Sequence, residues 1–175
     1  ITRSLFRTLS QHVLSPAKIV TEMNNSISDN NESNMFVTLI VGILDLETGI
    51  LKLCNAGHNP PILIYPDGQV SYLEFKTQIF VGVVEDFKYS DEEVVLEKES
   101  KLFLYTDGVT EAENINKELY GEEKLLEMLS DNASSDVRTT VNVVVDSIAS
   151  HVKEAEASDD LTILLIQYEP GTANS

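Results

Sequence analysis

The chain contains 175 residues, 42% of them hydrophobic, with only 8 Gly and 5 Pro, and this composition argues against a disordered or collagen-like chain and favours one compact domain. Twelve Lys and Arg residues against 29 Asp and Glu residues give a formal net charge of −17. The resulting field repels phosphate backbones and anionic lipids, which argues against nucleic-acid binding and membrane-surface binding.

Signals for membrane insertion and secretion are weak. No apolar run approaches the roughly 20 residues that cross a bilayer, and the first segment, ITRSLFRTLSQHVL, is amphipathic rather than the core of a signal peptide. The only cysteine, Cys54, cannot form an internal disulfide or a multi-cysteine zinc site, so we interpret it as a buried small hydrophobe in a reducing compartment. We therefore expect a cytoplasmic protein with no membrane insertion in this segment.

Two helices are expected at the start of the chain. Apolar residues at helical spacing predict the first over 3–14. Ser15 as N-cap and Pro16 as the first helical residue predict a second helix, which continues to Ile27. The polar run 28–34 cannot bury apolar surface and therefore predicts a loop.

Strands are expected through the middle of the chain. Segment 36–46 is rich in β-branched residues and is followed by a Glu47-Thr48-Gly49 turn, which predicts a hairpin with 50–56 whose first strand is buried. The sequence predicts further strands over 62–65, 69–75, 79–84, 92–97 and 101–105. The last of these is almost entirely apolar, as a central strand should be.

Helices return before a final strand. Helices are predicted from Gly121 to Leu129 and over 136–154, and the apolar run 161–168 predicts a buried strand. Residues 169–175 have no core-forming character and are expected to be a flexible tail behind a single domain at 1–168. Antiparallel hairpins with helices at both ends predict an α+β fold, with layers of sheet covered by helices.

Asp107 and Gly108 form the first candidate site. They follow a predicted buried strand, so a carboxylate there would be held rigidly at the rim of a sheet. Asp-Gly is also a common turn pair, and local chemistry alone favours the turn over a metal ligand.

Asp159 and Asp160 form the second candidate site, just before the last predicted strand. Adjacent carboxylates repel each other unless a cation or hydrogen-bond donors neutralise them, although a solvated acidic loop is common in so acidic a protein. If the strands beside Asp107 and Asp159 are neighbours, the carboxylates converge into a set of hard oxygen ligands suited to Mg²⁺ or Mn²⁺.

Imidazole and nucleophile chemistry have little support. His12 and His151 fall on predicted helices and are interpreted as surface residues. His58 lies in the tight connection Asn55-Ala56-Gly57-His58, where a side chain often satisfies backbone groups, and we interpret it as structural. A Ser/His/Asp triad has no support in the sequence beyond the presence of those residue types, and no phosphate-cradling glycine loop is present.

Five segments together resemble a known family, in the order in which that family carries them. They are MFVTLIVGILDLETG (35–49), CNAGHNPPILIYPDG (54–68), LFLYTDGVTEAEN (102–114), LYGEEKLLEML (119–129) and SDDLTILLI (158–166). The chain is similar to the PPM-type metal-dependent protein serine/threonine phosphatases, and most similar to the bacterial branch of stage II sporulation and sigma-B regulator phosphatases. YTDGVTEA and the spaced DD-x-T are the most specific parts of the resemblance.

The resemblance implies an α-β-β-α sandwich of two antiparallel sheets flanked by helices. It implies that Asp107 and Asp159 are metal ligands with catalytic roles, and it leaves the standing of Asp160 less defined. Gly108 would permit the turn that aims Asp107, and the NAGH motif with Asn55, Gly57 and His58 would be structural.

The resemblance also implies a mechanism and partners. Two Mn²⁺ or Mg²⁺ ions would activate a water that hydrolyses phosphoserine or phosphothreonine on a protein. The expected substrate is a phosphorylated antagonist of the anti-anti-sigma type, which places the protein in sigma factor regulation and the stress response. A sensor or regulatory domain is expected upstream.

One departure from the family qualifies these expectations. The family's first strand and its Asp-x-Ser-Gly-His-Gly run, which supplies the metal-bridging Asp, do not occur here, and the chain begins with Ile1. We therefore expect an N-terminally truncated domain lacking its first strand or strands, with weak or no metal binding and little activity. Open sheet edges would also favour a homodimer. The segment from Ile1 to about Asp29 resembles helices that act as a regulatory switch in relatives.

Two other classes of function are weighed. A non-catalytic pseudophosphatase would keep the fold and act as a partner-binding signalling module, but such a protein has no chemical need for converging acids at Asp107, Asp159 and Asp160. A structural or storage protein would use its acidity for solubility alone and gives no reason for carboxylates at strand ends.

Overall fold

The computed structural model describes residues 2–29, 31, 35–153, 155 and 159–170. Their contacts divide the chain into two compact units: the first contains the chain up to His58 together with Glu74–Leu96, and the second contains Asn59–Leu73 and Glu97–Glu169. Within the described residues, no helix combines the length and the hydropathy that a membrane span requires. Residues 171–175 of the expected tail lie outside the described residues.

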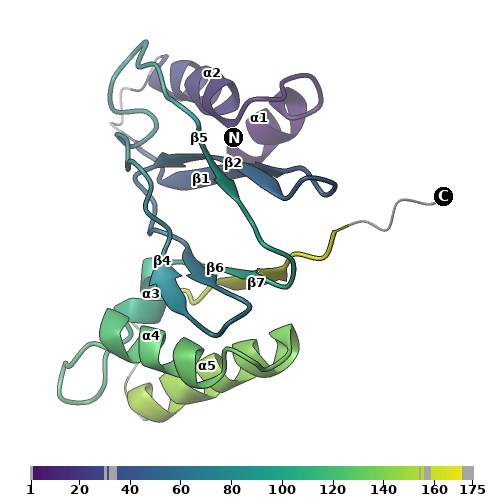
Figure 1. Ribbon diagram of the computed structural model, residues 1–175. Coiled ribbons are helices and arrows are strands. Elements are labelled where there is room, and N and C mark those ends of the chain that lie inside the picture. The colour runs from purple at the N-terminus through teal and green to yellow at the C-terminus, as the bar shows by residue number, and fades with distance from the viewer. Residues whose placement is uncertain (1, 30, 32–34, 154, 156–158, 171–175) are drawn as a thin grey trace. The chain divides into compact units, whose positions relative to one another are not determined.

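The first unit is a three-stranded antiparallel sheet with two helices on one face (Figure 1). Its strands are β1 (Leu39–Leu44), β2 (Ile50–Ala56) and β5 (Glu92–Val95), in the order β1-β2-β5. Helices α1 (Thr2–Leu9) and α2 (Pro16–Ser28) precede the sheet in sequence, and α2 packs on β1 and β2. The expected opening of two helices followed by a hairpin is confirmed.

Helix α2 begins where its capping residues predict. The Ser15 hydroxyl accepts a hydrogen bond from the Lys18 backbone N–H at 3.3 Å, and Pro16 occupies the first helical position. Asp91, the residue directly before β5, completes this cap. Its carboxylate accepts hydrogen bonds from the Ser15 hydroxyl at 2.7 Å and from the Ala17 backbone N–H. A charge-assisted contact from a distant part of the chain therefore fixes the helix to the sheet.

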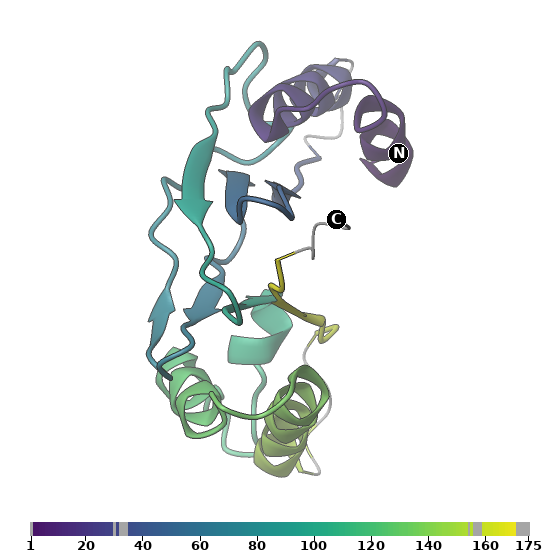
Figure 2. The same cartoon turned by 45° about the vertical axis from the view of Figure 1, so that its right-hand side comes forward.

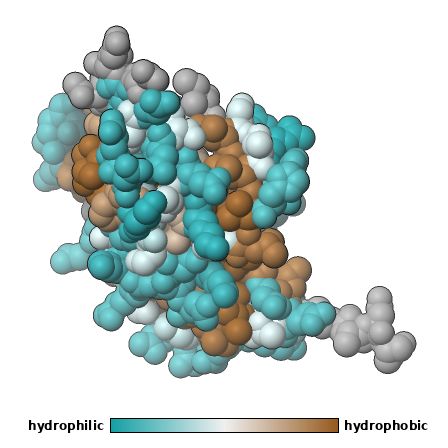
Figure 3. Space-filling model, turned by 90° about the horizontal axis from the view of Figure 1, so that it is seen from above, coloured by the Kyte–Doolittle hydropathy of each residue, from teal (hydrophilic) through white to brown (hydrophobic). Residues whose placement is uncertain are grey.

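The core of the first unit lies between α2 and the sheet. Its buried residues are Ala17, Ile19, Val20, Met23, Val41, Cys54, Ala56, Val81 and Tyr89. Helix α1 has no fully buried residue, although Leu5 and Leu9 pack against this cluster. At the surface, hydrophilic residues cover most of the face that is shown in Figure 3, and the exposed hydrophobic residues form separate areas on it.

Three expectations for the first unit are corrected. The first helix ends at Leu9 rather than near residue 14. Strand β1 is at the edge of the sheet, so Val41 is its only buried residue and the expected buried strand of the hairpin is β2 instead. The strand expected over 79–84 does not form, because Gly82 takes a φ of +91° and donates its N–H to the Asn24 side chain at 2.8 Å.

The second unit is a four-stranded antiparallel sheet with two helices on one face (Figure 2). The strand order is β4-β3-β6-β7, for β3 (Ile62–Ile64), β4 (Val70–Tyr72), β6 (Lys101–Tyr105) and β7 (Ile163–Gln167). Helices α4 (Glu122–Asp131) and α5 (Val137–Val152) cover the sheet, and a single helical turn, α3 (Asp107–Thr110), follows β6. Strand β6 is central, as its composition predicts.

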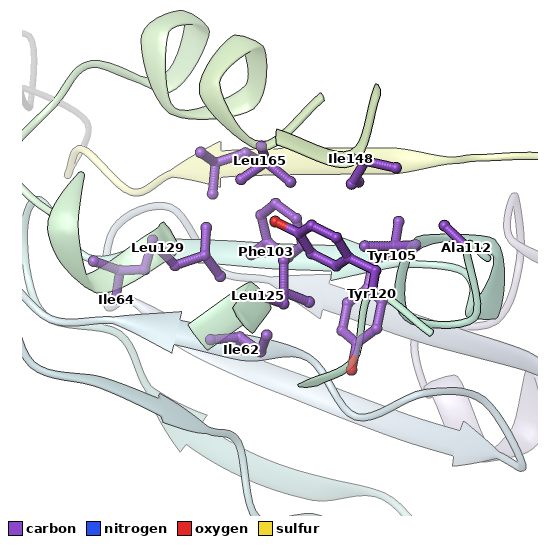
Figure 4. Close-up of a cluster of buried hydrophobic side chains, with 12 residues drawn as sticks. Ile62, Ile64, Phe103, Tyr105, Ala112, Tyr120, Leu125, Leu129, Ile148 and Leu165 are labelled. Carbon is purple, nitrogen blue, oxygen red and sulfur yellow. The ribbon is translucent and has the colours of Figure 1, made fainter. Parts of the chain in front are cut away.

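The core of the second unit lies between that sheet and the helices. Phe103 and Tyr105 of β6, Leu165 of β7 and Ile148 of α5 meet there (Figure 4). Alternation along a strand explains the pattern, since every second residue of β6 faces the helices. Lys101 is also buried, and its ammonium donates to the carbonyl oxygen of Ala133 at 2.7 Å and to that of Ser135.

Candidate metal centre

Strands β6 and β7 are antiparallel neighbours, which confirms the condition for the candidate carboxylates to converge. Tyr105 pairs with Ile163, so the end of β6 lies beside the beginning of β7. Asp107 follows the first of these strands and Asp159-Asp160 precedes the second. All three acidic residues therefore lie at one edge of the four-stranded sheet.

Thr106 joins the two segments that carry the carboxylates. Its backbone N–H donates to the Thr162 carbonyl at 3.1 Å, and its hydroxyl accepts from the Thr162 N–H at 3.2 Å. The same hydroxyl donates to the Asp160 carbonyl at 3.3 Å. Thr106 was not among the site residues expected from the sequence, although a hydroxyl residue between a central strand and Asp-Gly is a usable signal for such a link.

Gly108 allows the backbone of α3 to approach the acidic pair closely. A Cβ placed on Gly108 would lie 2.4 Å from the Asp160 carbonyl oxygen and 3.6 Å from the Asp159 Cβ. The φ angle of Gly108 is not in the left-handed region. Gly108 lies in the single turn α3, where a side chain would collide with the Asp160 backbone, so the close approach of the two segments requires a glycine.

The three acidic residues are exposed, and the carboxylates of Asp107 and Asp159 accept local hydrogen bonds. One Asp107 oxygen accepts from the Gly108 N–H at 3.0 Å, and one Asp159 oxygen accepts from the Asp160 N–H at 2.7 Å. Each carboxylate has a second oxygen, and carboxylate oxygens are the ligands that Mg²⁺ and Mn²⁺ prefer. The donor chemistry of Asp107 and Asp159 thus fits a hard divalent cation.

The number of ligands is smaller than in a complete metal site. Within the part of the chain that the structure describes, no three His, Cys, Asp or Glu side chains are grouped so that they could hold one metal ion. Cations held by few protein ligands keep most of their water and bind weakly. Asp107 and Asp159 are therefore candidate ligands, and the described residues form no complete metal site.

The NAGH motif lies in the first unit and has a structural arrangement. The Asn55 side-chain NH₂ donates to the His58 backbone carbonyl at 2.9 Å, and the Asn55 side-chain oxygen accepts from the His58 backbone N–H at 2.8 Å. Gly57 has a φ of +76°, and a Cβ there would lie 1.8 Å from a Phe80 ring carbon. The Asn55 side chain thus satisfies backbone groups of this connection.

The other two histidines lie away from the carboxylates in sequence and differ from each other. His12 follows α1 and is exposed. The Nε2 atom of His151, in the last turn of α5, lies 2.9 Å from the Glu118 carbonyl oxygen, and its ring packs edge-on against Tyr120. His151 therefore contacts the segment that precedes α4 and is more than an ordinary surface residue.

Two antiparallel sheets, each with helices, define the chain as a PP2C-like α+β protein, and comparison with solved structures supports this class. The SiaA-PP2C domain of Pseudomonas aeruginosa matches with a TM-score of 0.82 at 21% identity, over 96% of this chain and 68% of that one. RsbX, solved in complex with magnesium, matches with a TM-score of 0.65 at 18% identity, over 95% of this chain and 70% of that one. These similarities show the fold.

Sequence comparison identifies the family within this class. The family model described as Stage II sporulation protein E (SpoIIE) matches residues 1–169, and the chain belongs to this family. A curated relative is phosphoserine phosphatase RsbP of Bacillus subtilis (strain 168), 27% identical over 177 residues, which cover 97% of this chain and 42% of that protein. The chain spans less than half the length of the curated relatives it matches.

Proposed function

We propose that this chain is the catalytic part of a regulatory phosphatase that hydrolyses phosphoserine or phosphothreonine on a partner-switching protein of the anti-anti-sigma type. The observation that supports the proposal is the placement of Asp107 and Asp159 at adjoining ends of the neighbouring strands β6 and β7, with Gly108 packed against Asp160. Membership of the SpoIIE family and similarity to a phosphoserine phosphatase support the same chemistry.

Asp107 and Asp159 would hold divalent cations, with Asp160 beside them. A bound Mn²⁺ or Mg²⁺ ion supplies Lewis acidity, which lowers the pKa of a coordinated water and neutralises phosphate charge. Thr106 keeps the two acidic segments at a fixed separation through its three hydrogen bonds. Because the carboxylates are exposed, a phosphorylated side chain on another protein could reach them.

We propose that the complete domain binds two ions. Asp107 and Asp159 would supply some of the ligands, and a longer chain would supply the others. The partners we propose are the phosphorylated antagonist as substrate, an upstream sensor or regulatory domain, and a second copy of the protein. We also propose the bacterial cytoplasm as its compartment, since a free Cys54 is compatible with a reducing environment.

One observation favours a second candidate function. The described residues contain no group of three potential metal ligands, which is the arrangement expected of a pseudophosphatase that binds a signalling partner without turning it over. The placement of Asp107 and Asp159 at adjoining strand ends favours the enzyme, because partner binding alone does not require carboxylates there.

The decisive experiment is Mn²⁺-titrated hydrolysis of a phosphoserine protein by this chain and by a longer version with additional upstream sequence. We expect activity in the longer version, lost on Asp107→Asn, and little in the 175-residue chain. If neither version were active but both still bound the phosphoprotein, the proposal of an enzyme would be replaced by that of a pseudophosphatase.

A further inference from the structure

A polar hollow lies in the first unit, beside the C-terminal end of α2. It has a volume of about 200 Å³ and is lined by Asn25, Ser28, Asp29, Glu85 and Asp86. The first three residues come from α2 and its C-cap, and the other two from the loop that follows residues 79–84. None of these residues belongs to the candidate metal centre.

The walls of this hollow are fixed by Asn24, which is fully buried. Its side-chain NH₂ donates to the Val84 carbonyl at 2.8 Å, and its side-chain oxygen accepts from the Gly82 N–H at 2.8 Å. Both contacts tie the 82–86 loop to α2 immediately beside the hollow. The lining residues are therefore held on a defined frame rather than on an unattached loop.

Two polar atoms in the lining lack partners. The Asn25 side-chain oxygen and the Ser28 hydroxyl are both buried, and neither has a hydrogen-bond partner among the described residues. Ser28 is only 6% exposed and lines the hollow. Buried polar groups in native proteins are nearly always satisfied, so these atoms indicate a missing hydrogen-bonding group, and the Asn25 oxygen requires a donor.

The negative charge around the hollow favours a positively charged ligand. Glu85 and Asp86 place two carboxylates on its rim, and none of the ion pairs within the described part of the chain includes either of them. The C-terminal end of α2 adds the negative end of a helix dipole. A ligand that donates hydrogen bonds and carries positive charge therefore fits all of these features.

The same features favour an organic cation over a metal ion. No three acidic, His or Cys side chains of the described residues are grouped as metal ligands, so the acceptors here are dispersed around the hollow. Guanidinium and ammonium groups carry several N–H donors that can satisfy acceptors spread in this way. Val83 and Val84, exposed by 51% and 41%, lie next in the same loop and could cover the aliphatic stem of such a side chain.

We propose that this hollow is a docking site for an arginine or lysine side chain of a protein partner. The proposal does not depend on phosphatase activity, because it concerns different residues and a binding event alone. The hollow would let this acidic chain recognise a basic segment of the partner at one defined place. Complementary charge on two proteins orients them as they meet and raises their association rate.

The test uses ¹⁵N-labelled protein and two small probes, N-acetyl-L-arginine amide and the matching citrulline amide, which has similar shape but no charge. We expect saturable NMR shift changes at the Asn25 side chain, Ser28 and residues 85–86 with the arginine probe only. The double variant Glu85→Gln/Asp86→Asn should bind the arginine probe about two- to fivefold more weakly, as expected for the loss of exposed charge pairs. Asn tolerates the left-handed backbone of Asp86, so this variant should remain folded.

Glu22→Gln is the matched control. It removes one carboxylate from an exposed position on α2 that does not line the hollow, and its affinity for the arginine probe should be unchanged. Equal responses to the arginine and citrulline probes, or no saturable response, would overturn the proposal. Shifts at the same residues on adding Mg²⁺, Mn²⁺ or Ca²⁺ alone would replace it by an inorganic cation site.

Discussion

Gly108 and Asp160 are packed so closely that a Cβ on the glycine would lie 2.4 Å from the aspartate carbonyl oxygen and 3.0 Å from its carbonyl carbon. The obstacle is backbone, which cannot rotate away as a side chain can. This contact joins the segment that carries Asp107 to the segment that carries Asp159 and Asp160. The position of the candidate carboxylates therefore depends on the absence of a side chain at residue 108.

Gly108→Ala is the first prediction. The added methyl group should displace the Asp160 backbone, lowering the free energy of unfolding by about 1–3 kcal/mol, as for other overpacked sites. Gly42→Ala is the matched control, because its closest obstacle is the end of the flexible Leu53 side chain at 2.7 Å. Urea unfolding of both variants measures the difference, and equal losses of stability would contradict the packing described here.

Asp107→Asn is the second prediction, to be made in the longer, active version of the protein. It should abolish metal-dependent hydrolysis, because it removes an anionic ligand. Folding stability should change little, since Asn keeps an oxygen that can accept from the Gly108 N–H and the side chain is exposed. Parallel phosphatase assays and thermal unfolding check both parts, and near-normal activity would refute the metal-ligand assignment.

Val41→Asp is the third prediction. Val41 is 6% exposed and packs in the core of the first unit, so an unpaired charge there should destabilise that unit by about 3 kcal/mol or more. Val95→Asp places the same group in the same sheet at a residue that is 64% exposed and should be tolerated. Circular dichroism during denaturation compares them, and a cooperative, stable Val41→Asp protein would be incompatible with the observed burial.

Loss of stability at alkaline pH is the fourth prediction. Burial raises the pKa of Cys54 from 9.0 to about 12 and that of Tyr89 from 10.0 to about 12. Above pH 9 the unfolded chain therefore releases protons that the native protein retains. The stability linked to the thiol is fully present below pH 9 and falls by at most about 1.4 kcal/mol per pH unit as the pH rises towards 12.

Cys54→Ala isolates the thiol contribution to this pH dependence. Burial lowers the pKa of Lys101 from 10.5, so its titration makes the protein more stable as the pH rises towards 10.5. In the parent protein this gain in stability overlaps with the loss caused by the thiol. Between pH 9 and 10 the variant should lose stability less steeply than the parent. Identical slopes in urea titrations would show that the native thiol ionises as readily as the unfolded one.

The order of elements and the type of fold could be predicted from the sequence. Apolar periodicity, the Ser15-Pro16 cap and turn residues act between near neighbours, and these local signals agree with the observed helices and strands. Segment 79–84 has strand-forming residues but remains irregular, because Asn24, distant in sequence, takes the Gly82 N–H that a ladder would have used. Local propensity cannot anticipate such a competitor.

The candidate site, too, could be predicted only in part from the sequence. The sequence identified Asp107, Asp159 and Asp160 as chemically notable and supplied the resemblance to a phosphatase family, because residue types and their spacing are properties of the chain. It could not assign Gly108 its role or connect Asp91 to Ser15. Nor could it find the hollow beside Asn25 and Ser28. Each of these is a contact between segments far apart in the chain, and only packing in three dimensions decides which of them meet.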